Sequence, residues 1–172
     1  MMTSVKIEKA NLSHAEGIAK QANNLKICLH LRRTWPLPYL KEHAIEFINT
    51  MDSSDSDHLK TIIYNNEVVG VIGLHKTNEI ENEREIGFWI GEAFWGKGIT
   101  TKAIKLMVKY AFDELKLNRI YSYANVGNEA SKYAQINAGF TETGIVTQEC
   151  KPSEIRDQYT FEYLKEDYFK AL

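Results

Sequence analysis

Apolar residues recur along this chain with a period of two in some segments and of three to four in others. The alternation in VKIEKA from Val5 predicts a short strand, and Ser13 is placed to cap a helix that runs to about Ala22. After an extended segment at Pro36 and Pro38, an apolar stripe at helical spacing predicts an amphipathic helix through Leu40, Ala44, Phe47, Ile48 and Met51.

The central part of the chain predicts paired strands. Residues 52–57 hold three aspartates and three serines, which is typical of a solvated loop. Two runs rich in isoleucine and valine then flank Asn65 and Asn66, which tolerate the positive φ of a tight turn, so we predict a hairpin. The segment EREIGFWIG predicts a further strand with two faces, one carrying Arg84, Ile86, Phe88 and Ile90 and the other Glu85, Gly87 and Trp89.

The second half of the chain alternates between helical and strand patterns. Apolar residues at helical spacing predict a helix that starts near Thr100 and includes Ile104, Val108, Ala111 and Leu115. We then expect a strand from Arg119, a helix from Asn128 to Asn137 that stops at Gly139, and a closing strand from Gln158. Hairpins mixed with helix-linked strands predict an α+β fold with a mixed sheet.

Length and composition add limits to this picture. The chain has 172 residues, 44% of them hydrophobic, which suits one domain over residues 1–172 with its own core. A formal net charge of -2 marks no general affinity for nucleic acid or for a membrane surface. Cys28 and Cys150 lack CxxC or zinc-like spacing, and no segment resembles a signal core or a membrane span, so we expect a soluble cytoplasmic protein.

Between the strand that ends at Ile90 and the next helix lies AFWGKGITTKA, with Gly96 and Gly98 around Lys97. Such a loop presents backbone N–H groups at the positive end of a helix, a geometry that binds phosphate. It lacks the GxxxxGK spacing of a P-loop, and Thr101 replaces the third glycine of the GxGxxG dinucleotide motif. A tight turn before a helix explains the same residues, so local spacing leaves both interpretations open.

Longer segments around this loop carry a resemblance. Residues 84–112, REIGFWIGEAFWGKGITTKAIKLMVKYAF, and 117–140, LNRIYSYANVGNEASKYAQINAGF, resemble the GNAT acetyltransferase superfamily, in particular its ribosomal-protein N-acetyltransferase-like branch. TWPLPY at residues 34–39 is similar to the proline-containing segment before the second helix of that branch. The resemblance implies the GNAT (acyl-CoA N-acyltransferase) fold, a mixed and mostly antiparallel sheet flanked by helices, with splayed strands that form the CoA cleft.

The resemblance further implies that acetyl-CoA is the cosubstrate, that a primary amine is acetylated, and that no metal takes part. The family's phosphate loop has Gln or Arg, two variable residues, Gly, one variable residue, then Gly or Ala. Here these positions hold Trp95, Gly98 and Thr100, so the first and last depart from the pattern, although tryptophan is common in this branch. The implied CoA contacts are Trp89, Ile90, Trp95, Gly96, Lys97, Gly98, Ile99, Thr100, Thr101 and Asn128, with the acetyl carbonyl near the Ile90 N–H.

The segment NEAS holds the candidates for the proton donor. Asn128 is a good helix N-cap and Ser131 fits the first helical turn, which explains both residues without chemistry. By the resemblance, Asn128 contacts CoA and Ser131 helps to protonate the leaving thiolate. Tyr133 is the alternative acid.

The attacking amine must lose a proton, and a carboxylate is the expected base. Glu85 shares a strand face with Trp89 and is favoured over Glu149, which follows the last predicted helix in a region where related enzymes can place a catalytic glutamate. Ordinary exposed carboxylates explain both residues equally well. An aromatic set is a candidate for an acceptor pocket or for core packing: Trp35, Tyr39, Phe88 and Trp89.

Two functions remain open at this level. The preferred one is an acetyl-CoA-dependent N-acetyltransferase that binds both substrates together and transfers the acetyl group directly. The alternative is a non-catalytic CoA-binding or sensory module with the same fold. The acceptor, whether a protein N-terminus or a small-molecule amine, does not follow from the fold, and neither does the choice between monomer and homodimer.

Overall fold

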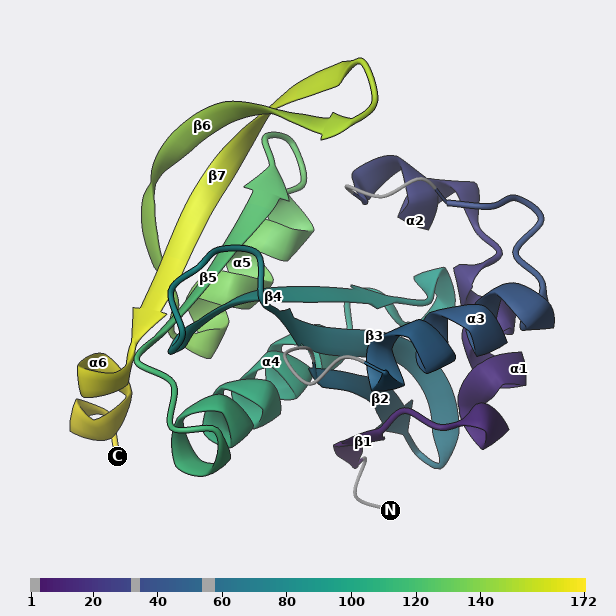
Figure 1. The fold of residues 1–172 in the computed structure, drawn as a ribbon, viewed down its shortest axis with the longest axis horizontal. Helices are drawn as coiled ribbons and strands as arrows, with labels where there is room; N and C mark the ends of the chain where they lie inside the picture. Colours follow the sequence, from purple (N-terminus) through teal and green to yellow (C-terminus); the bar gives the residue numbers. More distant parts are fainter. Residues whose placement is uncertain (1–3, 32–34, 54–57) are drawn as a thin grey trace.

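The computed structural model describes residues 4–31, 35–53 and 58–172 of the chain. Seven strands in these residues form one sheet with the order β1-β2-β3-β4-β5-β7-β6. The strands are β1 (Val5–Lys9), β2 (His58–Tyr64), β3 (Glu67–His75), β4 (Glu83–Ile90), β5 (Arg119–Asn125), β6 (Thr141–Lys151) and β7 (Glu154–Leu164). Neighbouring strands are antiparallel except for the parallel pair β4 and β5, where two halves of the sheet meet (Figure 1).

Helices cover both faces of the sheet (Figure 1). On one face lie α1 (Ala15–Ala22) and α3 (Lys41–Asp52), and on the other lie α4 (Ile99–Lys109) and α5 (Glu129–Ala138). A π-helical turn, Tyr110–Glu114, continues α4. The short helix α2 (Leu25–His30) lies near the tip of β5, and α6 (Lys165–Lys170) follows β7.

The core consists of two hydrophobic clusters on opposite faces of the sheet. The larger packs α4 and its continuation against strand residues such as Ile72, Leu74 and Ile120, all fully buried. The smaller packs α1 and α3 against β3 and β4. Because side chains alternate along a strand, β4 contributes Ile86 to the first cluster and Trp89 to the second, which confirms the predicted two-faced strand.

Several predicted turns and helix ends are confirmed. Asn65 and Asn66 join β2 to β3 with φ of 49° and 67°, the positive values that the hairpin prediction requires. Asn128 is the N-cap of α5, and Gly139 ends this helix with φ of 111°. These residues were recognisable because each relieves a local backbone constraint that does not depend on the rest of the fold.

Other boundaries differ from the predictions. Asn11, rather than Ser13, is the capping residue: it caps a short 3-10 turn, Leu12–His14, that leads into α1, and its side-chain oxygen accepts the N–H of Ser13 at 3.0 Å. Leu40 precedes α3 instead of belonging to it, and it is exposed. The closing strand begins at Glu154 rather than Gln158. Asp52 ends α3, while residues 54–57 of the predicted acidic loop lie outside the described residues.

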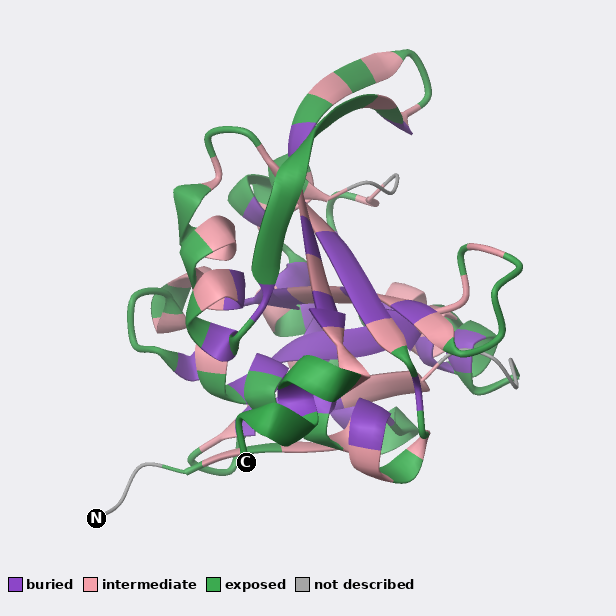
Figure 2. Cartoon of the chain, turned by 90° about the vertical axis from the view of Figure 1, so that its left-hand side faces the viewer, coloured by how far each residue is buried: buried purple, intermediate pink, exposed green. Residues whose placement is uncertain are grey.

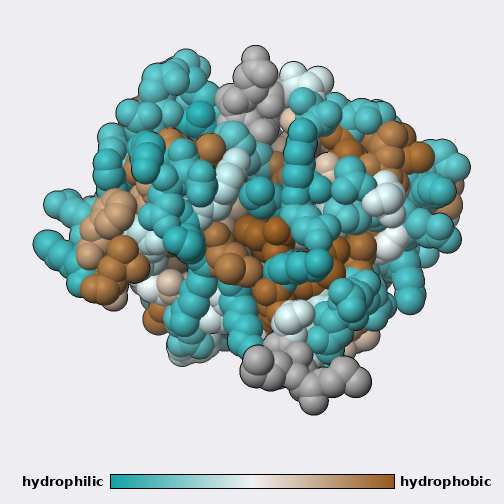
Figure 3. Space-filling model, turned by 90° about the horizontal axis from the view of Figure 1, so that it is seen from below, coloured by the Kyte–Doolittle hydropathy of each residue, from teal (hydrophilic) through white to brown (hydrophobic). Residues whose placement is uncertain are grey.

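Three elements were not predicted: α2, β6 and α6. The reason is clearest for β6, in which residues 141–147 are all exposed, so this edge strand shows no alternation of buried and exposed positions (Figure 2). Viewed from below, the surface is largely hydrophilic around a smaller hydrophobic area (Figure 3). Across the described part of the chain, no helix combines the length and the apolar character that crossing a bilayer requires.

Candidate active site

A gap opens in the sheet where β4 and β5 part. Their parallel pairing involves only residues 83–85 of β4, although this strand continues to Ile90. Gly91 donates its N–H to the carbonyl oxygen of Val69 on β3 at 2.7 Å. Since an antiparallel ladder alternates in steps of two, Phe88 and Ile90 direct their backbone groups away from β3 and into the gap.

A cleft of about 1030 Å³ extends through this gap. It is lined by the ends of β4 and β5, the loop before α4, one side of α5, and residues of α2, α3, β2, β3, β6 and β7. Twelve of the fourteen predicted site residues line it: Glu85, Trp89, Ile90, Trp95, Gly96, Gly98, Ile99, Thr100, Thr101, Asn128, Ser131 and Tyr133. The structure therefore gathers in one place residues that are separated by up to 48 positions in the sequence, from Glu85 to Tyr133.

Two predicted site residues do not line the cleft. The ammonium of Lys97 lies 5.6 Å from the centroid of the Phe94 ring, a cation–π contact beside the cleft. Glu149 is exposed on β6, where it is paired in register with Ile155 of β7. Its neighbour Cys150 does line the cleft, so Glu149 lies one residue from the wall.

The amino-terminal end of α4 has the form of an anion site. Gly96 and Gly98 both have φ of 74°, and a Cβ built at either position would have no atom within 4 Å. Gly98 caps α4 without any side-chain hydrogen bond. The first helical N–H that donates to the Gly98 carbonyl oxygen is that of Lys102, at 3.3 Å. The N–H groups of residues 99–101 therefore have no acceptor within the helix, and they fit the oxygens of a phosphate group.

Trp95 joins this loop to the end of β4. Its indole Nε1 donates a hydrogen bond to the carbonyl oxygen of Ile90 at 2.9 Å. The bond occupies the last carbonyl of the strand and leaves the Ile90 N–H as the donor that faces the gap. This tie gives a structural reason for tryptophan at a position where the family pattern has glutamine or arginine.

Ser131 lies in the first turn of α5 with its hydroxyl held by a neighbour. Asn128 Oδ1 accepts the backbone N–H of Ser131 at 3.4 Å, the contact expected of an N-cap. Ser131 Oγ accepts a hydrogen bond from Gln135 Nε2 at 3.3 Å, which leaves the hydroxyl hydrogen itself available to the cleft. Tyr133, the alternative acid, also lines the cleft but is 54% exposed.

Gln135 is a site residue that the sequence analysis missed. Its side chain is fully buried, and its Oε1 has no hydrogen-bond partner among the described residues. A buried amide oxygen without a partner costs about 1–3 kcal/mol, so packing alone does not explain a glutamine at this position. The signal in the sequence was a polar residue one turn after Ser131, on the apolar side of the helix.

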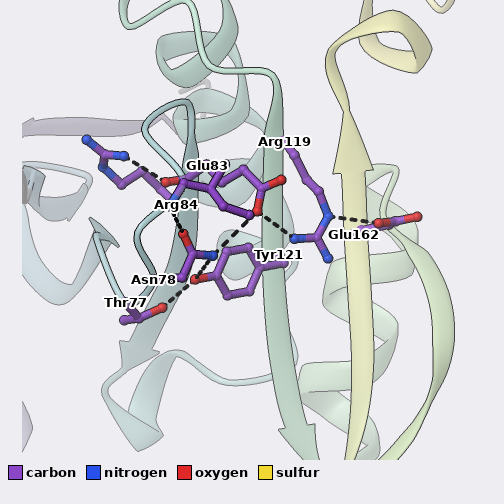
Figure 4. A network of polar contacts seen from close by, with 8 residues as sticks. Thr77, Asn78, Glu83, Arg84, Arg119, Tyr121 and Glu162 are labelled. Carbon is purple, nitrogen blue, oxygen red and sulfur yellow. Dashed lines mark hydrogen bonds and ion pairs between the residues drawn. The ribbon is translucent and has the colours of Figure 1, made fainter.

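A polar network closes the end of the cleft where β4 and β5 meet (Figure 4). Arg119 of β5 donates to Glu83 of β4 at 3.0 Å and to Glu162 of β7 at 2.9 Å, which joins three strands through one guanidinium. Because the carboxylates lie on either side of Arg119, the network fixes the point from which β4 and β5 diverge.

The loop between β3 and β4 is attached to the same network (Figure 4). The Tyr121 hydroxyl forms hydrogen bonds with Thr77 and with Asn78 Nδ2, the latter at 3.1 Å. Burial raises the pKa of Tyr121, against the opposing effect of the Thr77 hydrogen bond, so the hydroxyl stays protonated at neutral pH. This network could not be predicted from the sequence, because its members come from three separate segments.

Helix α2 borders the cleft and is held at both ends. Asn24 and Lys26 bind the Glu92 carboxylate at 2.8 and 2.7 Å, and Asn125 Nδ2 donates to the His30 carbonyl oxygen at 3.3 Å. Burial lowers the pKa of His30, assisted by the charge of Arg156, so this imidazole is neutral near pH 7. The described residues contain no group of three His, Cys, Asp or Glu side chains arranged to hold a metal ion.

Known proteins share this architecture. A solved spermidine N-acetyltransferase from Vibrio cholerae, in complex with CoA and spermine, superposes with a TM-score of 0.81 at 20% identity, covering 96% of this chain and 98% of that one. The ribosomal-protein-S5-alanine acetyltransferase of Vibrio fischeri gives 0.81 at 15% identity, covering 95% and 94%. At such identities these similarities show the fold alone.

Sequence comparison gives a closer relationship. YdaF of Bacillus subtilis (strain 168), provisionally named a ribosomal N-acetyltransferase, is 42% identical over 83 residues, or 48% of this chain and 45% of the relative. The match thus spans less than half of that relative's length. Residues 5–141 match the family model described as an acetyltransferase (GNAT) domain, which covers the chain from β1 to the start of β6. With most of its length matched, this chain belongs to the GNAT acetyltransferase family.

Proposed function

We propose that this protein is an acetyl-CoA-dependent N-acetyltransferase that transfers the acetyl group directly to a primary amine. One observation carries the proposal: the uncapped first turn of α4 and the unpaired edge of β4 open into the same cleft. An anion site and a strand edge fit the two ends of a molecule that has a pyrophosphate and an amide-bearing arm. The Vibrio cholerae neighbour, which was solved in complex with CoA and spermine, supports this assignment.

In this proposal the N–H groups of residues 99–101 bind the pyrophosphate, and Gly96 and Gly98 let it approach the main chain. The amide-bearing arm lies along β4 and hydrogen-bonds to Phe88 and Ile90 in place of β5. Trp89 and Asn128 complete the contacts. The acetyl carbonyl then lies near the Ile90 N–H, which stabilises the negative charge that develops on its oxygen.

The reaction forms a C–N bond and breaks a C–S bond. The amine attacks the thioester carbonyl, and when the tetrahedral intermediate collapses the thiolate accepts a proton from the hydroxyl of Ser131, which lines the cleft and regains a proton from the cleft water that receives the proton of the attacking nitrogen. The attacking nitrogen loses its proton towards Glu85, while Tyr133 and Glu149 are the second choices for acid and base. Five residues of strand separate Glu85 from Ile90, roughly 16 Å, which is farther than one water spans, so a chain of waters in the cleft carries the proton to Glu85.

Substitution of Gln135 by leucine is expected to lower kcat about tenfold and to leave the KM for acetyl-CoA within twofold. Leucine removes the donor that holds Ser131 Oγ, and it also removes the unpartnered buried oxygen, so the unfolding temperature does not fall. Steady-state kinetics and thermal unfolding measure both effects. In a Ser131→Ala background the same substitution has no further effect on kcat if Gln135 acts through Ser131, whereas an additional tenfold loss contradicts this role.

The proposed function is tested first by calorimetric titration with acetyl-CoA, using ATP and NAD as controls, followed by measurement of CoA release with a panel of amines. We expect selective binding of acetyl-CoA and CoA release in proportion to the added amine. Failure of folded protein to bind acetyl-CoA would refute the site assignment. Binding without CoA release would instead favour the non-catalytic CoA-binding module.

A further inference from the structure

The chain turns sharply after β4, and the turn brings Trp95 back to the end of this strand. A single 3-10 turn, Glu92–Phe94, follows the strand, and the backbone N–H of Trp95 donates to the Glu92 carbonyl oxygen at 3.1 Å. Trp95 therefore lies beside Ile90, five positions earlier in the sequence. Its indole Nε1 donates to the Ile90 carbonyl oxygen at 2.9 Å, so the turn places a side-chain donor on the last residue of β4.

Contacts from α1 and α2 hold this turn in place. The Glu92 carboxylate accepts hydrogen bonds from Asn24 at 2.8 Å and from Lys26 at 2.7 Å. A Cβ at Gly91 would lie 2.1 Å from the side-chain oxygen of Gln21, so the lack of a side chain at this glycine lets α1 approach the turn closely. These contacts form without a ligand. The indole donor is therefore in position before acetyl-CoA binds, as electrostatic stabilisation of a transition state requires.

Ile90 directs its backbone N–H and its carbonyl oxygen to the same side of β4, into the gap. The proposed function assigns the acetyl carbonyl to this N–H. The neighbouring carbonyl oxygen carries partial negative charge, and without a partner it would repel the acetyl oxygen as negative charge develops there. The indole N–H of Trp95 occupies the Ile90 carbonyl oxygen instead. At this point the strand edge therefore offers a donor without a free acceptor beside it.

We propose that Trp95 is a positioning residue for the thioester carbonyl: its indole N–H offsets the charge of the Ile90 carbonyl oxygen, so that the Ile90 N–H polarises the acetyl carbonyl more strongly. The proposal rests on the proposed function and deepens it, because it assigns to Trp95 a role that does not depend on contact with CoA. A tryptophan that is 43% exposed gains less from leaving water than a buried one, so the hydrogen bond is the more specific reason for this residue.

Trp95→Phe and Trp95→Gln separate the donor from the ring. Phenylalanine keeps an aromatic ring and removes the N–H, whereas glutamine removes the ring and keeps an N–H as many bonds from Cα as the indole Nε1. We expect Trp95→Phe to lower kcat about tenfold and to leave the dissociation constant of acetyl-CoA within about threefold, because the lost interaction acts in the transition state. Trp95→Gln is expected to restore kcat at least threefold above the phenylalanine variant, roughly a third of the logarithmic span of such terms or more.

Steady-state kinetics measure kcat with the amine that gives the fastest CoA release in the panel, and calorimetry measures the dissociation constant. Thermal unfolding verifies that both variants are folded. A loss of kcat that follows the ring, with the glutamine variant low and the phenylalanine variant near the wild type, would overturn the proposal. A large loss of acetyl-CoA affinity with unchanged kcat would also overturn it, because Trp95 would then act only as a CoA contact.

An infrared measurement tests the same role without turnover. Acetyl-CoA labelled with ¹³C at the thioester carbonyl reports the polarisation of this carbonyl through its stretching frequency. We expect binding to the wild type to lower the frequency relative to free acetyl-CoA, and Trp95→Phe to lose about half of this shift or more, because the Ile90 N–H then acts beside an uncompensated carbonyl oxygen. The glutamine variant is expected to regain the shift.

The outcomes separate the proposal from the function on which it rests. Equal carbonyl frequencies in the wild type and in Trp95→Phe would overturn the role of Trp95 and leave an acetyltransferase. A shift that depends on the indole N–H, in a protein that turns over no amine, would refute the proposed function and support the role of Trp95. Failure of the folded wild type to bind acetyl-CoA would refute both.

Discussion

Gly98→Trp is expected to weaken acetyl-CoA binding at least 100-fold while the protein stays folded. Gly98 has φ of 74°, and a Cβ at this position would have no neighbour within 4 Å, so a large side chain would extend into the open space beside the first turn of α4. That space is where we place the pyrophosphate. Blocking it removes the hydrogen bonds of residues 99–101 together. Titration calorimetry with acetyl-CoA measures the effect.

Backbone strain must be separated from this steric effect. Any L-residue in the left-handed region costs roughly 1–2 kcal/mol, so Gly98→Ala carries the strain without the bulk. We expect both variants to lose similar unfolding temperature, and the alanine variant to lose less than tenfold in acetyl-CoA affinity. If the two variants bind acetyl-CoA equally well, the loop does not form the anion site.

Ser131→Ala is expected to lower kcat about 100-fold and to leave the dissociation constant of acetyl-CoA within twofold. General acid catalysis typically contributes a factor of about 10²–10⁴, and the Ser131 hydroxyl hydrogen is free to move to the thiolate because Gln135 donates to its oxygen. Alanine keeps the helix and its N-cap, since Asn128 bonds to the backbone N–H of residue 131. Steady-state kinetics and calorimetry measure the two quantities.

Tyr133→Phe is the matched control for this experiment. Tyr133 lines the same cleft from the same helix, but it is 54% exposed and is the second choice as acid. We expect its loss to change kcat less than fivefold. A large loss in the phenylalanine variant with little effect of Ser131→Ala would transfer the role of acid from Ser131 to Tyr133.

The sequence identified those parts of the fold that depend on local constraints. The Asn65–Asn66 turn, the Asn128 cap and the glycine-bearing start of α4 each depend on a few neighbouring residues, and each was predictable. The two faces of β4 followed from alternation, because helices cover both sides of this strand. The position of the cleft also followed from local features, since the glycine-bearing loop before α4 directly follows the end of β4.

Features that depend on contacts between distant segments could not be predicted. Arg119 joins Glu83 to Glu162, which lies 79 positions along the chain from Glu83, and no local pattern marks such a contact. Gln135 resembled an ordinary polar helix residue until its burial was known. The role of Glu149 as a base is still a prediction. Glu149 lies next to Cys150, which lines the cleft, because β6 pairs with β7, and the sequence indicated only β7 of this hairpin.

The short parallel contact between β4 and β5 has a consequence for the free protein. Three residue pairs, the Arg119 network and the covering helices hold the two halves of the sheet together, and all of the strand pairing lies at one end of β4, so a ligand adds cohesion at the other end. A cosubstrate that binds across the gap holds the two halves of the sheet together. By mass action, the free energy of unfolding then rises with the concentration of the cosubstrate. The supply of acetyl-CoA would then affect the folded fraction of the chain as well as its rate of turnover.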